Sequence, residues 1–385
     1  MKSKISVDSK VYDDLGGVEE IIATHLDEKL FEGLTEEDKY VAENILDALT
    51  GGRGLRAFLT IDEISKQIGR NEEKVRAILE HLIKKRIVHP PGKEDKIKGY
   101  ELIHDFLSRR FFERLSPEAR KIKTVIDIFR RAFRDWKQDG VLVSEDRLEM
   151  FYDIKDKLSW GDEECEFVLR SSFITYWYSE NEWVKYFNSE IVIRICLNII
   201  KGEENAKVMK GAIQTLGDTK EKRVVKPLIK IIDGDKRDDV RETAIDQFWF
   251  KLMDARIIDT LLKILKNERN YKLRKSAVSA LSKYEEKRVV NALVESLHDS
   301  RVNVRAEAAY ALGNIHDKSA IEHLIGALEN EYSKRPRKNI IVALGKFLDD
   351  ERVRPLLKSV VENDKEEYEV RQEAKWVLGR FSRLG

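Results

Sequence analysis

The chain has few cysteines, few prolines and almost no net charge. Its 385 residues include two cysteines, Cys165 and Cys196, and six prolines. Two scattered thiols supply neither a disulfide framework nor a zinc ligand set, which suits a reducing compartment. A formal net charge of +1 gives no general attraction to nucleic acid. No apolar run reaches the roughly 18 residues of a membrane helix, and residues 1–10 lack the apolar core of a signal peptide. We therefore expect a cytoplasmic protein without a membrane segment.

The common catalytic and metal-binding signatures are also missing. There is no Gly-x-x-x-x-Gly-Lys-Ser/Thr phosphate loop, no Gly-x-Gly-x-x-Gly turn, no His-Glu-x-x-His pair and no Gly-x-Ser-x-Gly elbow. The seven histidines do not fall at metal-ligand spacing from carboxylates or cysteines. We expect a chain that is not an enzyme and that holds no metal and no cofactor of its own.

What the sequence has instead is a repeat. The phrase Arg-Ala-Glu-Ala-Ala-Tyr-Ala-Leu-Gly begins at Arg305 and recurs with substitutions through the C-terminal half. Spacings of 33, 31, 32 and 34 residues separate the arginines that open the copies, which are Arg241, Arg274, Arg305, Arg337 and Arg371. An earlier copy lacks the arginine but keeps Ala212, Leu216 and Gly217. A fixed period in this range is typical of a stacked solenoid.

Each copy has a second half, such as Val225-Lys226-Pro227-Leu228-Ile229. Apolar residues at helical spacing in both halves predict a helix pair for every copy. One pair cannot bury its apolar face alone, so neighbouring pairs must supply the core. The small alanine lets helices approach, and the glycine after leucine is expected to end its helix. This pattern resembles HEAT repeats, of the short kind also seen in phycobilin lyases.

A different pattern precedes the array. Thr60 and Glu63 form a capping box for a helix over residues 61–68, and a second helix is predicted over 72–86. A charged hairpin tip over 93–98 and an extended run over 99–103 follow. Helix, turn, helix and two short strands predict a winged helix. Glu72 and Glu73 begin the second helix and would meet DNA phosphates with the wrong sign, so a structural or protein-contact role is favoured over DNA binding.

The end of this region resembles a known family. Ile103-His104-Asp105 resembles the Met-His-Asp motif that closes the winged-helix domain of STAND ATPases, with isoleucine in place of methionine. Leu34-Thr35-Glu36-Glu37-Asp38 resembles the connector that leads into that domain, and the similarity extends over roughly residues 12–175. The resemblance implies that His104 contacts the phosphates of bound ADP and that Asp105 supports it. The alternative is that His104 only caps a helix.

That role needs a nucleotide-binding ATPase domain, which this family carries before the connector and which the 385 residues do not show. Either such a domain acts in cis or in trans, or the chain descends from such a protein and acts without nucleotide. In both cases we do not expect the chain itself to hydrolyse nucleotide. The expected fold class is mainly α: an α–α superhelix, a HEAT-repeat solenoid, preceded by a small winged-helix domain with a short β-wing. The expected domains are connector helices (1–40), the winged helix (41–115), a helical connector with or without degenerate repeats (116–200) and the array (201–385).

A binding surface can be predicted from the repeat. We expect the second helices to line the concave side, where a protein partner would bind. Aligning the copies on Leu228, Leu261, Leu293, Leu324 and Leu356 selects the polar positions two residues before and after each leucine. These are Lys226, Lys230, Asp259, Lys263, Asn291, Glu295, Glu322, Arg354 and Lys358, with Gly326 in the fourth copy.

Three functions remain open at this stage. The leading hypothesis is a non-catalytic protein-binding scaffold, the sensor and winged-helix part of a STAND-type signal-transduction switch, with defence as one setting. The alternative is a DNA-binding transcriptional regulator that uses the winged helix. The third, ranked last because nothing in residues 1–200 accords with it, is a phycobilin-lyase-like HEAT protein.

Overall fold

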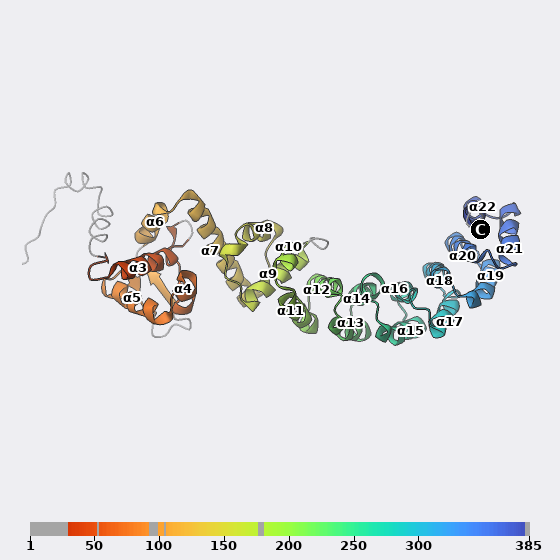
Figure 1. Cartoon of the computed structure of the whole chain (residues 1–385), viewed down its shortest axis with the longest axis horizontal. Coiled ribbons are helices and arrows are strands. Elements are labelled where there is room, and N and C mark those ends of the chain that lie inside the picture. The colour runs from red at the N-terminus through yellow and green to blue at the C-terminus, as the bar shows by residue number, and fades with distance from the viewer. Residues whose placement is uncertain (1–29, 52–53, 92–98, 104, 176–180, 382–385) are drawn as a thin grey trace, which may run out of the picture. The chain divides into compact units, whose positions relative to one another are not determined.

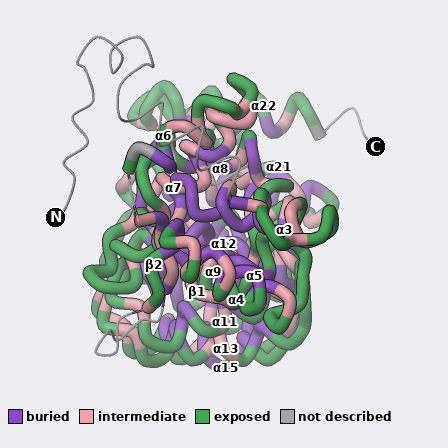
Figure 2. The backbone as a smooth tube through the Cα atoms, turned by 90° about the vertical axis from the view of Figure 1, so that its left-hand side faces the viewer, coloured by how far each residue is buried: buried purple, intermediate pink, exposed green. Residues whose placement is uncertain are grey.

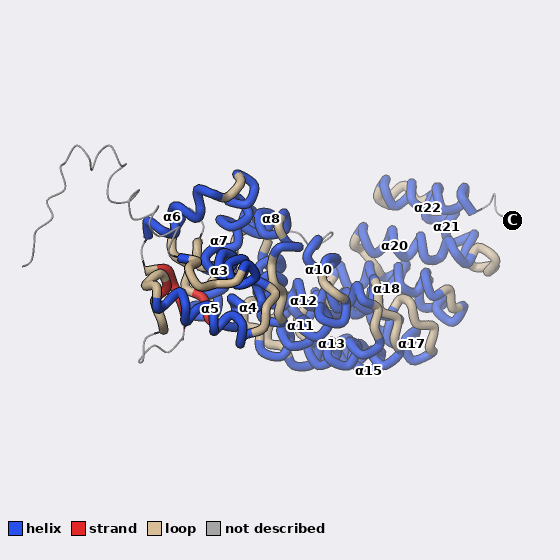
Figure 3. Tube along the Cα trace, turned by 60° about the vertical axis from the view of Figure 1, so that its left-hand side comes forward, coloured by secondary structure: helices blue, strands red, loops and turns tan. Residues whose placement is uncertain are grey.

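The protein consists of two compact units, residues 1–168 and 169–385, whose boundary falls inside α9 (Asp162–Ile174). The computed structural model describes residues 30–51, 54–91, 99–103, 105–175 and 181–381 (Figure 1). The predicted hairpin tip over 93–98 and His104 lie outside these residues. Within the described chain, strands occur in the first unit, whereas the second consists of helices and loops (Figure 3).

The first unit combines helices with a small sheet. Its elements are α3 (Glu36–Ala48), β1 (Leu59–Thr60), α4 (Ile61–Ile68), α5 (Glu72–Lys84), β2 (Val88–His89), β3 (Gly99–Leu102), α6 (Asp105–Arg114), α7 (Pro117–Asp139), α8 (Glu145–Asp153) and the 3-10 turn Lys155–Lys157. The strands are ordered β1-β3-β2, and both pairs are antiparallel. Leu59 faces Tyr100, and Val88 faces Leu102.

Side chains cap several helix starts in this unit, and the predicted capping box is among them. Thr60 and Glu63 form the expected capping box, with each side chain satisfying a backbone N–H of the other residue. The Thr35 side chain caps α3 by accepting from Asp38, and Ser116 caps α7. The second predicted helix ends two residues early, at Lys84, because Arg86 has a left-handed backbone with φ of 60°.

Two apolar clusters hold the first unit together. Val41 and Ile45 of α3 pack with Leu79 and Leu82 of α5, and none is more than 1% exposed. Further along, rings from α7 meet rings from α8 and α9, as in the edge-on contact of Phe129 with Phe151 at 5.1 Å. Helix α7 is therefore packed along one face, and its other face remains available for polar side chains.

The second unit is a series of helices in which the predicted pairs recur. Before the repeats lie α10 (Glu182–Tyr186) and α11 (Ser189–Gly202). The first helices of the repeats, of which α12 lacks the arginine, are α12 (Ala206–Thr219), α14 (Asp238–Phe250), α16 (Tyr271–Leu281), α18 (Val302–Ile315), α20 (Lys334–Leu344) and α22 (Tyr368–Phe381). Their partners are α13 (Lys222–Gly234), α15 (Ile258–Asn267), α17 (Lys287–Ser296), α19 (Ile321–Asn330) and α21 (Val353–Glu362), with 3-10 turns at Ala255–Ile257, Lys318–Ala320 and Gly345–Phe347.

Small residues bring the first series of helices close together. Ala277, Ala308 and Ala374 are fully buried where successive helices meet, and burial alternates with exposure along the helices (Figure 2). A Cβ atom placed on Gly313 would lie 2.9 Å from the Cα of Ala343 on the next helix of the series. The expectation that glycine ends these helices is wrong for Gly313, because α18 continues to Ile315. Glycine is needed there for close approach instead.

This close packing sets the direction in which the second unit bends. Figure 1 shows α12, α14, α16, α18, α20 and α22 on the inner side of the bend, and α13, α15, α17, α19 and α21 on the outer side. We call the first set the inner helices and the second set the outer helices. Small residues permit short separations on the inner side, while Leu, Ile and Val side chains hold the outer helices further apart. The prediction that the second helix of each repeat lines the concave side is therefore wrong, because the first helices lie there.

The predicted fold class is confirmed: the described chain is mainly helical, with a superhelical array of stacked helix pairs and a small three-stranded sheet. None of its described helices has both the length and the apolar character needed to cross a bilayer.

Gly313→Ala should destabilise the array by about 1–3 kcal/mol, because the added methyl group collides with the backbone of α20. The matched control is Gly326→Ala in α19, where a Cβ atom meets nothing within 4 Å. That change should be neutral or add up to about 1 kcal/mol through helix propensity. Chemical denaturation of both variants is the measurement, and equal midpoints would contradict the packing argument.

Candidate protein-binding surface

The arginine that opens each repeat is a structural residue. The Nε and Nη2 atoms of Arg305 donate to the Glu331 carboxylate over 2.6 and 3.0 Å, and Nη1 donates to the Asp299 carbonyl over 2.9 Å. The Glu331 side chain is 8% exposed and that of Arg305 is 18% exposed. Arg274 holds the Asp299 carboxylate in the same two-pronged manner. Each arginine thus ties its helix to the turn that begins the next repeat.

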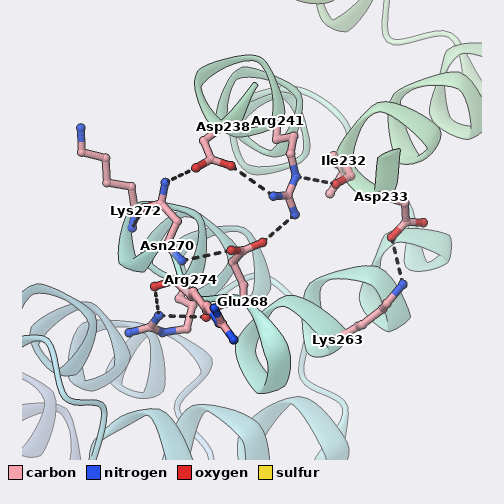
Figure 4. A network of polar contacts seen from close by, with 10 residues as sticks. Ile232, Asp233, Asp238, Arg241, Lys263, Glu268, Asn270, Lys272 and Arg274 are labelled. Carbon is pink, nitrogen blue, oxygen red and sulfur yellow. Dashed lines mark hydrogen bonds and ion pairs between the residues drawn. The ribbon is translucent and has the colours of Figure 1, made fainter. Parts of the chain in front are cut away.

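Figure 4 shows another copy of this link, at Arg241. Its guanidinium contacts the Glu268 carboxylate at 2.8 Å and donates to the Ile232 carbonyl over 2.8 Å. Glu268 also accepts from the backbone N–H of Asn270, so one acid satisfies both the arginine and the next helix start. Arg337 and Glu366 repeat the pair. The acid lies 25 residues after Arg274, 26 after Arg305 and 29 after Arg337. This recurring spacing is a sequence signal that was not used in the prediction.

These acids remain ionised when buried. Burial alone would raise the pKa of Glu331, but hydrogen bonds from Arg305 and from the backbone of Ser333 outweigh it and lower the pKa below its ordinary value of 4.5. The same balance lowers the pKa of Glu268 and Asp299. Stability from these groups is present above their unfolded-state pKa values and is lost as the pH falls through the lower folded-state values. The repeated arginines therefore hold the array together at neutral pH.

The residues predicted to bind a partner lie on the outer helices. All nine are exposed. Three of them form ion pairs with residues of a neighbouring repeat: Asp259 with Arg288, Lys263 with Asp233, and Glu322 with Arg352. The charges that alternate along this face thus partly neutralise one another within the chain. These pairs provide a structural explanation for the pattern that the sequence analysis assigned to binding.

In the last copy, the predicted positions Arg354 and Lys358 lie one residue out of register with those of the other copies. In the other copies the reference leucine is fully buried and lies five residues after the arginine or serine of the preceding turn, as in Leu261 after Arg256. In the last copy Leu357 meets both conditions, whereas Leu356 is only half-buried. The equivalent outer positions are therefore Pro355 and Ser359 rather than Arg354 and Lys358.

The inner helices present a different surface, which we call the inner face. Its members stand five and nine residues after each repeated arginine, on the side of the helix opposite the buried alanines. They are Asp246, Phe250, Ser279, Lys283, Tyr310, Asn314, Val342, Lys346, Trp376 and Arg380. Tyr310 and Trp376 are 46% and 49% exposed, and Phe250 is also exposed. Lys346 and Arg380 lie near the rings of Tyr310 and Trp376. The repeat pattern does not indicate this face, because these helices are expected from the sequence on the convex side.

Asp246 is the electrostatically unusual member of the inner face. Burial first, and then the nearby Glu242 carboxylate, raise its pKa from 3.8 to about 6, against opposition from Lys275 and Ser276. The site therefore favours a neutral carboxyl group in slightly acidic solution and carries a strained negative charge above that range.

In the first unit, the described part of the predicted nucleotide contact is Asp105. Its exposed carboxylate accepts from Nε of Arg56 over 2.6 Å, and Arg56 also donates to the Leu102 carbonyl. This link ties β3 and the start of α6 to the segment before β1. His104 lies outside the described residues, so its role stays a prediction.

The described residues offer no cluster of His, Cys, Asp and Glu arranged to hold a metal ion. Both cysteines are buried, and burial raises the pKa of the Cys196 thiol far above its usual range. A protonated, enclosed thiol is a poor nucleophile.

Comparison with known families supports both halves of the architecture. The family described as Novel STAND NTPase 1 matches residues 2–141, and HEAT repeats match residues 258–338. A search of curated proteins gave no significant match. The chain thus contains a STAND NTPase-related region and HEAT repeats, a combination that fits a repeat-based protein-interaction module.

Several solved structures match this chain at low similarity. Human deoxyhypusine hydroxylase in complex with glycerol is 18% identical, with a TM-score of 0.31, over 69% of this chain and 98% of that one. A designed armadillo repeat protein in complex with the peptide (KR)4 is 18% identical, with a TM-score of 0.37, over 49% and 99%. Kap121p bound to RanGTP is 13% identical, with a TM-score of 0.43, over 98% and 48%.

Arg305→Ala should destabilise the array by about 2 kcal/mol, because it leaves the buried Glu331 carboxylate without its charged donor. Arg352→Ala is the matched control, since Arg352 forms a similar pair with Asp350 and Glu322 in an exposed position. The control should have a much smaller effect. Urea denaturation at pH 7 compares them, and an equal loss in both variants would contradict a special role for the repeated arginine.

Asp246→Asn should stabilise the protein at pH 7 by about 1 kcal/mol, after allowance for solvent screening. Because the folded-state pKa is raised, the unfolded chain gives up the proton more readily, so wild-type stability falls as the pH rises from about 4 to about 6. The substitution removes this decline. Asp239→Asn on the same helix is the control with the opposite sign, because a hydrogen bond from Lys210 lowers the pKa of Asp239. Denaturation at pH 4.5 and 7.5 tests both variants.

Proposed function

We propose that the chain is a non-catalytic binding and regulatory module that recognises a protein partner through the inner face of its HEAT array. The matches to HEAT repeats and to a STAND NTPase family support this proposal. In it the array is the sensing arm of a STAND-type switch, and the first unit is the part that couples the array to a nucleotide-binding ATPase domain supplied in cis or in trans.

The observation that carries the proposal is the row of exposed rings on the inner helices. Tyr310 and Trp376 occupy the same repeat position on α18 and α22, and both remain nearly half exposed. Nearby cations at Lys346 and Arg380 add polar contacts to the ring faces. Tyrosine, tryptophan and arginine are the residues that most often dominate protein–protein binding energy. The nine described positions predicted on the outer helices include no aromatic residue, and several of their charges are already paired.

The first unit is proposed to act as a winged helix that contacts protein. The order α3, β1, α4, α5, β2, β3, with antiparallel strands, supports the winged-helix interpretation. The first turn of α5 carries Glu72 and Glu73, both exposed, where a DNA-reading helix would need neutral or basic residues. Lys85 at the other end of α5 pairs with Glu32. These charges favour a protein or domain contact over DNA.

Tyr310→Ala combined with Trp376→Ala should weaken partner binding by at least about tenfold, because each ring supplies apolar contact that alanine cannot replace. The partner is first identified by affinity capture with the wild-type chain and is then purified. Its affinity is measured by isothermal titration calorimetry. Both side chains are substantially exposed, so the melting temperature should change little.

The control is the outer-face variant in which Lys226, Lys230 and Lys263 are all changed to Glu. The proposal requires this variant to bind as the wild type does. Loss of binding in the outer-face variant with full binding in the inner-face variant would show that the array uses its convex side and would refute the proposal.

A further inference from the structure

The first unit contains a cavity lined by arginines. The cavity has a volume of about 270 Å³ and lies between the segment before β1 and one face of α7. Four arginines line it, Arg56, Arg130, Arg131 and Arg134, together with the Asp127 carboxylate. Positions 127, 130, 131 and 134 follow helical spacing, so α7 directs one charged face at the cavity.

Three of these four arginines lack a carboxylate at ion-pair distance among the residues that the structure describes. Arg56 is the exception, since it pairs with Asp105 at 2.6 Å and Glu101 at 3.6 Å. Within the part of the chain that the structure describes, Arg130, Arg131 and Arg134 form no ion pair. Like charges one helical turn apart repel each other and destabilise a helix. Packing of α7 therefore gives no reason for this cluster.

Arg130 shows the effect of this arrangement most clearly. Its Nη2 atom donates to the neutral side-chain oxygen of Gln67 over 2.7 Å. Burial lowers its pKa, and Arg134 adds to this effect, while Asp127 and Glu63 act in the opposite direction. A partly desolvated guanidinium without a carboxylate at ion-pair distance gains strongly when an anion arrives.

The remaining wall of the cavity is apolar. Phe58 and Leu55 line it, and the ring of Phe58 is 43% exposed although it packs against Gly99 of β3. A side chain at position 99 would collide with the Phe58 ring, so the glycine allows this ring to pack directly against β3. The cavity thus offers guanidinium groups on one side and an aromatic ring on the other.

We propose that this cavity binds a small molecule that carries phosphate groups. Planar guanidinium groups donate in pairs to phosphate oxygens, and one polyanion can balance several arginines at once. A volume of about 270 Å³ suits a small ligand rather than a folded partner. The site is separate from the inner face of the array and goes beyond the proposed protein recognition.

Isothermal titration calorimetry on the full chain tests the proposal with tripolyphosphate, ATP and adenosine as probes. Tripolyphosphate or ATP should bind, adenosine should not, and affinity should fall as salt is added. Arg131→Gln combined with Arg134→Gln should weaken binding at least about tenfold, from the loss of charge-assisted hydrogen bonds. Both side chains are exposed, so the variant should fold normally. Arg147→Gln, an exposed arginine on α8, is the matched control and should bind as the wild type does.

A second substitution distinguishes the source of the phosphate. Phe58→Leu keeps an apolar contact with Gly99 but removes the ring. If this change weakens ATP binding and leaves tripolyphosphate unaffected, the ligand is a nucleoside phosphate. If it affects neither probe, the site recognises the phosphate chain alone. Either result supports the proposal. No binding of either phosphate probe, equal affinity in the double arginine variant, or binding of an acidic peptide in place of both probes would overturn it.

Discussion

The array depends on the contact between a repeated arginine and the acid of the following turn, which is two-pronged at Arg274, Arg305 and Arg337. Arg305 and Glu331 illustrate why: both are largely buried, and each satisfies hydrogen-bonding groups that would otherwise have no partner. Because a helix pair cannot bury its apolar face alone, links between neighbouring pairs decide whether the array forms. A charge that is buried and fully paired also specifies one register between repeats, since a shifted neighbour would leave the carboxylate unpaired.

The tight packing of the inner helices determines what the array can present to a partner. Alanine and glycine on these helices allow the short contact between Gly313 and Ala343, and the exposed side of each helix then faces the inside of the bend. Large rings such as Tyr310 and Trp376 stand on that side without covering one another. On the outer helices, by contrast, several charged side chains form ion pairs with residues of the neighbouring repeat. Stability and recognition are therefore divided between the two faces.

The first unit places its charge differently. In the array, arginines are matched by acids one repeat away, whereas Arg130, Arg131 and Arg134 on α7 have no ion-pair partner among the described residues. An unpaired, partly buried charge such as that of Arg130 costs free energy, and an anion from outside the fold would offset this cost. The same reasoning separates the two proposals, because the inner face relies on rings and shape while the α7 cavity relies on charge.

The sequence by itself determined the repeat, the helix pairs, the capping box at Thr60 and the mainly α fold class, because these follow from local spacing and local hydrogen bonds. Only the tertiary structure decided which helices lie on the inside of the bend, since curvature depends on how closely neighbours approach. It also decided that Gly313 serves packing rather than helix termination, and that the Arg305 phrase carries its partner 26 residues away. A contact between residues distant in the chain has no local signature, and the recurring spacing of arginine and acid gains its meaning only once the stacking of the helices is known.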